Sequence, residues 1–557
     1  MLTLLLTLAA SLFATARLQT YLQVYQQEEY DTPRFFAWML EKRAADKWAT
    51  LGLLLGSFIL LLPTTMHPAY PLFAAAWLGW RLRQEPSPTQ TGKKPLVPTP
   101  RANRLWWLAS ALATIPLAFI ATQTHGLTQA IALIAFIQTI PLWLAAANLL
   151  LWPLQFYQNQ QYLAECTTLL QRLNPLTIGL TGSFGKTSTK YILNHILSSH
   201  KPTLMTPGST NTPLGIARIV REQLQPHHSY FIAEMGAYGP GSIARLCKLA
   251  PPKISAITAV GDAHYERFKS LAAVAQTKFE ISQFQDFSPQ TQGNLCVLAI
   301  DGIPPEHWQP RVSQNSTRFL LVSQNAEHIR GPHDFHITQA TQTPQGLKLT
   351  IRHAGVETTF QTPLFGMQQV GNLGVAFALA TQLGLAKKAI AAAMASVPAA
   401  PHRLNVKREG TQTVIDDSYN SNPKGFAAAL EVLELVAQSR EANQGSARRS
   451  DSYRAGGQAA NRKILITPGM VELGTLHATE HAKLGQLAAQ KANIILAVNP
   501  TRIPTFLQAA QTQNQAQVIP VATLAAARQW LQANGQPHDV ILIENDLPDR
   551  YESRWTL

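Results

Sequence analysis

Leu176-Thr-Ile-Gly-Leu-Thr-Gly-Ser-Phe-Gly-Lys-Thr187 joins a short apolar run to a glycine-rich turn, and a helical stretch follows from Thr187. Strand, glycine-rich turn and helix are the setting that a phosphate-binding loop requires. Backbone N–H groups and the helix N-terminus would bind the anion, Lys186 would neutralise phosphate charge, and the Thr187 hydroxyl would ligate Mg²⁺. Leu180 stands where the general form of the motif has its first glycine. By itself this stretch predicts ATP binding.

The residues around the loop predict an α/β fold. From about residue 170, short apolar runs alternate with helical stretches, which is typical of a mostly parallel sheet. Further buried strands are expected at 230–233, 254–259 and 295–299. Near 335–362 the pattern changes to short alternating strands, which we interpret as an antiparallel annex. We therefore expect a central ATP-binding domain over 170–403.

A second, smaller Rossmann-like domain is expected over 404–557. Its strand candidates are 413–416, 463–467, 494–498 and 539–543, with helices between them. Residues 439–462 are rich in Ser, Gly, Gln and Arg and show no apolar period. We expect a disordered surface insertion there, and a nucleic-acid-binding arm is the alternative.

The first 155 residues predict an α-helical membrane region. About five apolar segments occur in it: 1–16, 48–62, 70–80, 106–122 and 130–152. A span needs about 20 apolar residues, so the two segments at 48–62 and 70–80 are short and would be tilted spans or a re-entrant pair. The first segment lacks the basic start of a secretory signal.

The basic residues of the connecting loops predict the orientation. Residues 17–47 and 81–104 carry five and six Lys or Arg residues, whereas the turns at 63–69 and 123–129 carry none. Positive charge favours the cytoplasmic side. We therefore expect a multi-pass protein of the cytoplasmic membrane, with its N-terminus outside and both catalytic domains in the cytoplasm.

Composition narrows the function less than the motifs do. The 557 residues suit three or four structural units. A net charge of +14 would suit nucleic acid, an anionic membrane surface or acidic, phosphorylated substrates. The three cysteines, Cys166, Cys247 and Cys296, are widely spaced, so we expect reduced thiols rather than a disulfide framework.

A series of short motifs resembles the Mur ligases, the ATP-dependent amide ligases of peptidoglycan precursor synthesis. Thr181-Gly-Ser-Phe-Gly-Lys-Thr187 has that family's form of the phosphate loop, without the first glycine of the general motif. Other segments follow in the family's order and are closest to its MurF branch. They are Ala233-Glu-Met-Gly-Ala237, Asp262-Ala-His264 to Leu271, Val274-Ala-Gln-Thr-Lys278 to Ile281, Pro401-His-Arg403, Asp416-Asp-Ser-Tyr-Asn-Ser-Asn-Pro423 and Gly469-Met-Val-Glu-Leu-Gly474. The resemblance covers roughly residues 175–545.

The resemblance implies ATP and Mg²⁺ as cofactors and a carboxylate activated as an acyl phosphate. Metals and cations must then neutralise two anions that approach each other. The catalytic residues implied are Lys186, His264, Lys278 and Arg403. The metal-binding residues implied are Thr187, Glu234, His264 and Lys278, the last as a carbamate. The nucleotide-binding residues implied are Gly182, Ser183, Gly185, Lys186, Thr187, Ser188, Asn372, Arg403 and Asp417.

The chain departs from the family pattern at three places. Gly366-Met-Gln-Gln-Val-Gly-Asn372 has glutamines where a His-Asn pair is usual, and glutamine can still hydrogen-bond. Glu544 to Arg550 replaces a usual Lys-Gly-Ser-Arg segment. Membrane segments replace the soluble domain that binds the UDP-sugar, so recognition of that sugar does not carry over.

Three functions remain open at this stage. The leading hypothesis is a MurF-type ligase that adds D-alanyl-D-alanine, or a similar amine, to a muramoyl-peptide precursor beside the membrane. Membrane lipid and other cell-wall synthesis proteins would then be partners, and nucleic acid would not. The second is a ligase of the same family with another carboxylate substrate, and the third is an ATP-binding membrane scaffold without ligase activity.

Overall fold

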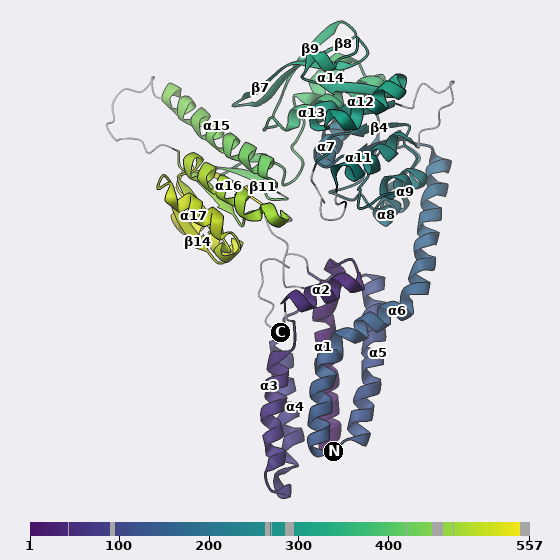
Figure 1. Ribbon diagram of the computed structural model, residues 1–557, viewed down its shortest axis with the longest axis vertical. Coiled ribbons are helices and arrows are strands. Elements are labelled where there is room, and N and C mark those ends of the chain that lie inside the picture. Colours follow the sequence, from purple (N-terminus) through teal and green to yellow (C-terminus); the bar gives the residue numbers. More distant parts are fainter. Residues whose placement is uncertain are drawn as a thin grey trace. The chain divides into compact units, whose positions relative to one another are not determined.

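The computed structural model describes residues 1–42, 44–89, 95–261, 268, 270–283, 295–419, 421–447, 461–471 and 473–545. The chain divides into two compact units. One contains Met1–Asn159, and the other runs from Gln160 to Asp546. Long helices make up the first unit, and two β-sheets with flanking helices make up the second (Figure 1). The predicted fold class is therefore confirmed.

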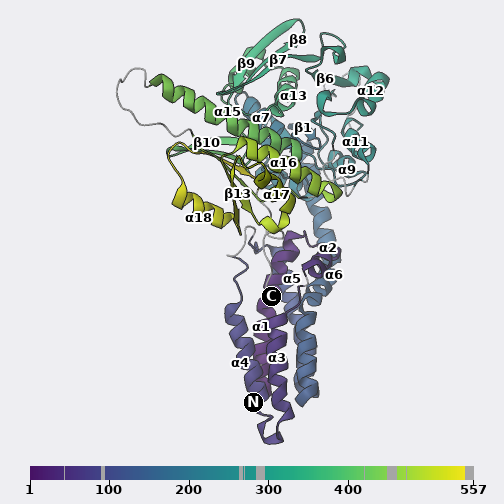
Figure 2. The same ribbon diagram turned by 60° about the vertical axis from the view of Figure 1, so that its left-hand side comes forward.

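The first unit is a bundle of helices, most of which run alongside one another in both ribbon views (Figure 1, Figure 2). Its helices are α1 (Leu2–Gln27), α2 (Thr32–Lys42), α3 (Lys47–Ser57), α4 (Ala69–Gln84), α5 (Pro100–Gln123) and the first part of α6 (Gly126–Leu173). Among the described residues, α1, α5 and α6 are long and apolar enough to cross a membrane. The two short segments form α3, which continues as a 3₁₀ turn to Leu61, and α4.

The outer surface of this bundle is apolar. Large hydrophobic side chains exposed on it include Leu8, Leu12, Leu54, Ile115, Phe119 and Leu149. These side chains lie on four different helices of the bundle, α1, α3, α5 and α6. The exposed leucines and aromatics are the surface that a lipid environment would cover.

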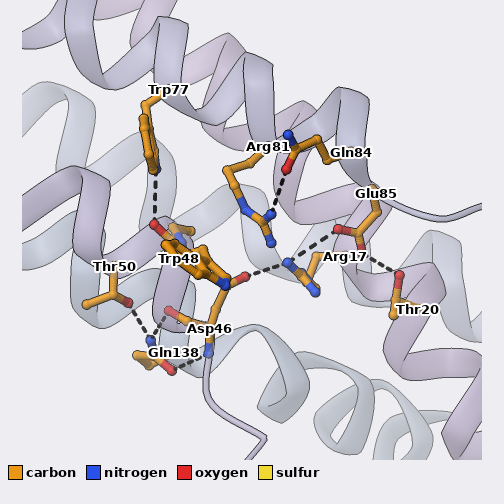
Figure 3. Close-up of polar contacts among 11 residues, drawn as sticks. Arg17, Thr20, Asp46, Trp48, Thr50, Trp77, Arg81, Gln84, Glu85 and Gln138 are labelled. Atoms are coloured by element: carbon orange, nitrogen blue, oxygen red, sulfur yellow. Dashed lines mark hydrogen bonds and ion pairs between the residues drawn. The ribbon is translucent and has the colours of Figure 1, made fainter. Parts of the chain in front are cut away.

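A buried ionic cluster lies inside the bundle (Figure 3). The guanidinium of Arg17, which is 2% exposed, lies 2.8 Å from the Asp46 carboxylate and 3.3 Å from that of Glu85. Asp46 also accepts a hydrogen bond from the Ala49 backbone N–H at the start of α3. Gln138 of α6 contacts both the N–H and the C=O of Asp46. Arg17 therefore connects α1 to α3, to the end of α4 and, through Asp46, to α6.

A nine-stranded sheet forms the middle of the chain. Its strands are β1 (Leu176–Thr181), β2 (Thr203–Met205), β3 (Tyr230–Glu234), β4 (Ile254–Ile257), β5 (Leu295–Ala299), β6 (Phe319–Ser323), β7 (Phe335–Thr343), β8 (Gly346–His353) and β9 (Val356–Thr362). The order is β2-β3-β1-β4-β5-β6-β7-β8-β9. Only the β7-β8 and β8-β9 pairs are antiparallel. The expected annex is thus an extension of the same sheet.

Helices cover both faces of this sheet. One apolar core joins it to α7 (Lys186–Ser198), α13 (Gln369–Gln382) and α14 (Lys387–Met394). The other core joins it to α8 (Pro213–Gln223), α9 (Ser242–Leu249), α11 (Leu271–Phe279), α12 (Pro305–Gln314) and the end of α6. The strand order reverses beside β1, and in open α/β sheets the ligand site lies at that point, outside the carboxyl ends of the strands.

A six-stranded sheet follows. Its strands are β10 (Asn405–Glu409), β11 (Gln412–Asp417), β12 (Lys463–Thr467), β13 (Ile494–Val498), β14 (Gln517–Val521) and β15 (Val540–Glu544), in the order β10-β11-β15-β12-β13-β14. Its helices are α15 (Pro423–Ala447), α16 (His477–Lys491), α17 (Pro504–Thr512) and α18 (Leu524–Asn534). Helix α15 runs through Ala447, so the first part of the expected insertion at 439–462 is helical. Residues 448–460 of it lie outside the described residues.

Candidate active site

The phosphate loop connects β1 to α7 and is tightly packed. The Ser183 N–H donates to the Ala259 carbonyl at 2.8 Å, and the Ser183 hydroxyl donates to the Gly261 carbonyl at 2.9 Å. A Cβ at Gly182 would lie 2.1 Å from the Thr258 hydroxyl oxygen, so only glycine fits there. Gly185 has φ +83°, a left-handed conformation that also favours glycine. The loop is therefore fixed before any anion arrives.

Glu234 lies directly beside this loop. It ends β3, whose register pairs it with Leu180 of β1, and it is 1% exposed. The Thr187 hydroxyl donates to the Glu234 carboxylate at 3.0 Å. A hydroxyl oxygen and a carboxylate oxygen thus meet at the first turn of α7. These are the hard oxygen ligands that Mg²⁺ prefers.

Two further residues contact Glu234, and the sequence analysis missed both. The ammonium of Lys190 lies 2.8 Å from Glu234 and is fully buried, and the Asn211 side-chain amide donates to Glu234 at 3.2 Å. Lys190 follows Lys186 by one helical turn, so both project from the same side of α7. That spacing was the available signal for Lys190, whereas Asn211 lies far away in sequence and no local pattern indicates it.

Lys186 bends back onto the phosphate loop. Its ammonium donates to the Gly182 carbonyl at 2.5 Å and lies 3.4 Å from the Ser183 carbonyl. Burial lowers the pKa of Lys186, Glu234 raises it, and the positive charges of Arg403 and Lys190 lower it further. An anion in the loop would relieve this crowding of positive charge, because it would add the counter-charge that Glu234 alone supplies here.

Asn372 reaches the loop from α13. Its side-chain oxygen accepts from the Thr189 hydroxyl at 3.3 Å, and its amide donates to Gln369 at 2.8 Å. A Cβ at Gly185 would lie 2.2 Å from the same oxygen. Gln369, one of the two glutamines that depart from the family pattern, therefore positions Asn372 against the loop.

Lys278 is buried on α11 and has no carboxylate within ion-pair distance among the described residues. It is 4% exposed. Burial lowers its pKa well below the ordinary value, and the positive charge of Lys186 lowers it further. Burial therefore favours the neutral, nucleophilic amine over the ammonium form at this position.

Arg403 lies in the segment between the two sheets. Its guanidinium stacks over the Tyr419 ring at 4.3 Å, and its neighbours His402 and Leu404 have φ +59° and +47°. A left-handed conformation is costly for residues other than glycine and recurs at switch regions. The Leu404 N–H donates to the Asp417 carboxylate at 3.0 Å. This segment thus links Arg403 and Asp417.

The structure brings most of the expected residues together. Gly182, Ser183, Gly185, Lys186, Thr187, Glu234 and Asn372 surround the phosphate loop. The positive charge of Arg403 lowers the pKa of Lys186, and that of Lys186 lowers the pKa of Lys278. Ser188 is half-buried on α7. His264 lies outside the described residues, so its place is an expectation from sequence.

A pair of carboxyl groups lies at the end of the second sheet. Asp417 of β11 is the register partner of Glu544 of β15, and the Ser421 hydroxyl donates to Glu544. Burial raises the pKa of Asp417 to about 6, and Asp416 raises it as well. Burial and the adjacent Asp417 raise the pKa of Glu544 well above its ordinary value. The departure at Glu544 therefore gives Asp417 an acidic neighbour, and the two carboxyl groups titrate as a pair.

Glu544→Gln should stabilise the protein at alkaline pH. Since burial and Asp417 raise the folded-state pKa of Glu544, its contribution to stability is full below the unfolded pKa of about 4 and is lost as the pH rises through the raised folded-state pKa. Removing this carboxyl should raise stability at pH 8 by on the order of 1 kcal/mol and change little at pH 4. Thermal unfolding of the full chain against pH measures this, with exposed Glu409→Gln as control. A variant that keeps the wild-type pH profile would contradict the raised pKa of Glu544.

Comparison with known proteins gives the family of this chain. Residues 180–380 match the Mur ligase middle domain. A UDP-N-acetylmuramoyl-tripeptide–D-alanyl-D-alanine ligase of Mycobacterium leprae is 30% identical over 66% of this chain and 70% of its own length. The chain belongs to the Mur ligase family. It is thus an ATP-dependent ligase of the carbon–nitrogen bond-forming kind.

Two further relatives support the family assignment. The ligase of the same name from Escherichia coli is 30% identical over 58% of this chain and 64% of its own length. A solved D-alanyl-D-alanyl ligase of Acinetobacter baumannii has a TM-score of 0.56 at 25% identity, and covers 72% of this chain and 77% of its own. The chain therefore spans about two thirds of these Mur ligases.

Proposed function

We propose that this chain is a membrane-held MurF-type ligase that joins D-alanyl-D-alanine, or a similar amine, to the carboxylate of a muramoyl-peptide precursor. The reaction consumes ATP and passes through an acyl phosphate. The observation that carries the proposal is the phosphate loop with Thr187 3.0 Å from Glu234. The names of the relatives support the substrate class.

ATP and Mg²⁺ fit the residues at the loop. The backbone of the glycine-rich loop from Gly182 to Gly185 would face the phosphates, and Lys186 would supply the charge for the β- and γ-phosphates. Thr187 and Glu234 would hold a Mg²⁺ ion, which would neutralise the developing charge of phosphoryl transfer. Lys190 would then share Glu234 with the metal, because it already contacts the same carboxylate oxygen.

The second half of the site would receive the substrate carboxylate. His264 and Lys278 would hold a further metal there, with Lys278 as a carbamate. Carbamylation requires a neutral amine, and burial favours that form of Lys278. Arg403 would bind the γ-phosphate, and Asp417 and Asn372 would position the nucleotide.

The helical unit supports a place at the cytoplasmic membrane. Three of its helices are long and apolar enough to cross a bilayer, and its outer surface is apolar. The basic loops between the apolar segments favour the cytoplasmic side for both catalytic domains. ATP and the precursor are present on that side.

The test is a ligation assay on the full-length protein in detergent. UDP-MurNAc-tripeptide, D-alanyl-D-alanine, ATP and Mg²⁺ are mixed, and the product mass and the released phosphate are measured. We expect a peptide product and phosphate in equal amounts, and neither when one substrate is left out. ATP hydrolysis without any product would contradict the proposal and favour a scaffold. If a product forms only when another carboxylate replaces UDP-MurNAc-tripeptide, the ligase acts on a different substrate.

A further inference from the structure

Two arginines at the start of α5 face α6 across a small pocket. Arg101 and Arg104 line it together with Asn148 and Gln155, and apolar side chains complete it: Leu105, Leu151 and Leu154. We call this the basic pocket. The non-atom space among these side chains is about 220 Å³, which includes open solvent, so the basic pocket is a shallow, open depression. Arg101 and Arg104 are three residues apart, so they project from one face of α5.

Neither arginine of the basic pocket has a carboxylate partner among the described residues. Arg101 contacts the Asn148 side-chain oxygen at 3.3 Å and lies over the Tyr30 ring at 4.0 Å. Arg104 contacts the side-chain oxygens of Gln158 at 2.9 Å and Gln155 at 3.4 Å. All these acceptors are neutral, so two adjacent positive charges are oriented without being neutralised.

The buried Arg17 of the same bundle shows the alternative arrangement. It has two carboxylates within 3.3 Å. An arginine that only anchors a helix at the membrane surface extends freely into water. Arg101 and Arg104 are instead half-buried and held by amide side chains of α6. Their guanidinium groups are thereby prepared for an external anion.

We propose that the basic pocket binds a phosphate-type oxyanion at the cytoplasmic edge of the membrane, as the headgroup of an anionic lipid would supply it. The planar guanidinium matches phosphate oxygens with two parallel hydrogen bonds. Leu105, Leu151 and Leu154 give an acyl chain an apolar surface beside the charge. Basic pockets between membrane helices on the cytoplasmic side are typical headgroup sites. The inference rests on the helical unit alone and is independent of the ligase reaction.

The test measures ligand-induced thermal stabilisation of the full-length protein in neutral detergent. The probes are short-chain phosphatidylglycerol, short-chain phosphatidylcholine and inorganic phosphate. Arg101→Gln/Arg104→Gln should weaken phosphatidylglycerol binding at least tenfold, because it removes the charge-assisted hydrogen bonds. Lys47→Gln/Arg83→Gln is the matched control, since it removes two exposed positive charges of the same bundle and should bind as the wild type does.

The variant Arg101→Lys/Arg104→Lys distinguishes a loss of lipid binding from a folding defect. It keeps both charges but loses the paired hydrogen bonds, so binding should fall between the wild type and the glutamine variant. Stabilisation by phosphatidylglycerol but not by inorganic phosphate assigns the site to lipid, and stabilisation by both assigns it to the oxyanion from either source. Wild-type binding by the glutamine variant, or no preference of the wild type for phosphatidylglycerol over phosphatidylcholine, would overturn the proposal.

Discussion

Lys278→Ala should lower amide ligation about 100- to 1,000-fold and leave the fold intact. Lys278 is 4% exposed on α11, and its pKa lies well below the ordinary value because of burial. Because burial favours the neutral amine from which a carbamate forms, we propose that Lys278 acts in the reaction as the carbamate formed with carbon dioxide. Steady-state product formation measures the loss.

Chemical rescue distinguishes the carbamate from a plain amine. Formate or acetate at millimolar concentration should restore part of the activity of Lys278→Ala, because a free carboxylate can fill the space of the missing group. Lys388→Ala, the same substitution at an exposed lysine of α14, should keep wild-type activity. Full activity of Lys278→Ala would remove this residue from the site, and a loss without rescue would argue against the carbamate.

Arg17→Met should destabilise the helical unit by about 3–5 kcal/mol. The Arg17 guanidinium is the only cation within ion-pair distance of both Asp46 and Glu85 among the described residues. Without it two carboxylates remain close together in an apolar interior (Figure 3). Thermal unfolding in detergent should show a midpoint lower by roughly 10 °C.

A charge-balanced variant tests the cause. Arg17→Met combined with Asp46→Asn and Glu85→Gln removes all three charges and should regain much of the lost stability, since Asn can still accept the hydrogen bond at the start of α3. Arg34→Met, at an exposed arginine of α2, is the control. If Arg17→Met unfolds within about 2 °C of the wild type, the ion pairs contribute no net stability.

The sequence alone determined the features that depend on neighbours along the chain. The phosphate loop from Gly182 to Thr187, the strand before it and the helix after it follow from local apolar periods and glycine positions. The strands at 463–467 and 494–498 were predicted at their observed bounds for the same reason. The order of short motifs then sufficed for the family.

Only the tertiary structure decided which charges meet. Lys190 and Asn211 both contact Glu234. Glu544 is the register partner of Asp417. Arg17 forms ion pairs with Asp46 and Glu85. These partners are 23 to 127 residues apart in the sequence, and the pairing of β1 with β3 brings Lys190, which follows β1, to Glu234. The positions of charged residues in a sequence follow no period from which their ionic partners could be predicted. Burial and strand or helix packing set which groups are desolvated together, and with them the raised pKa of Asp417 and the lowered pKa of Lys278.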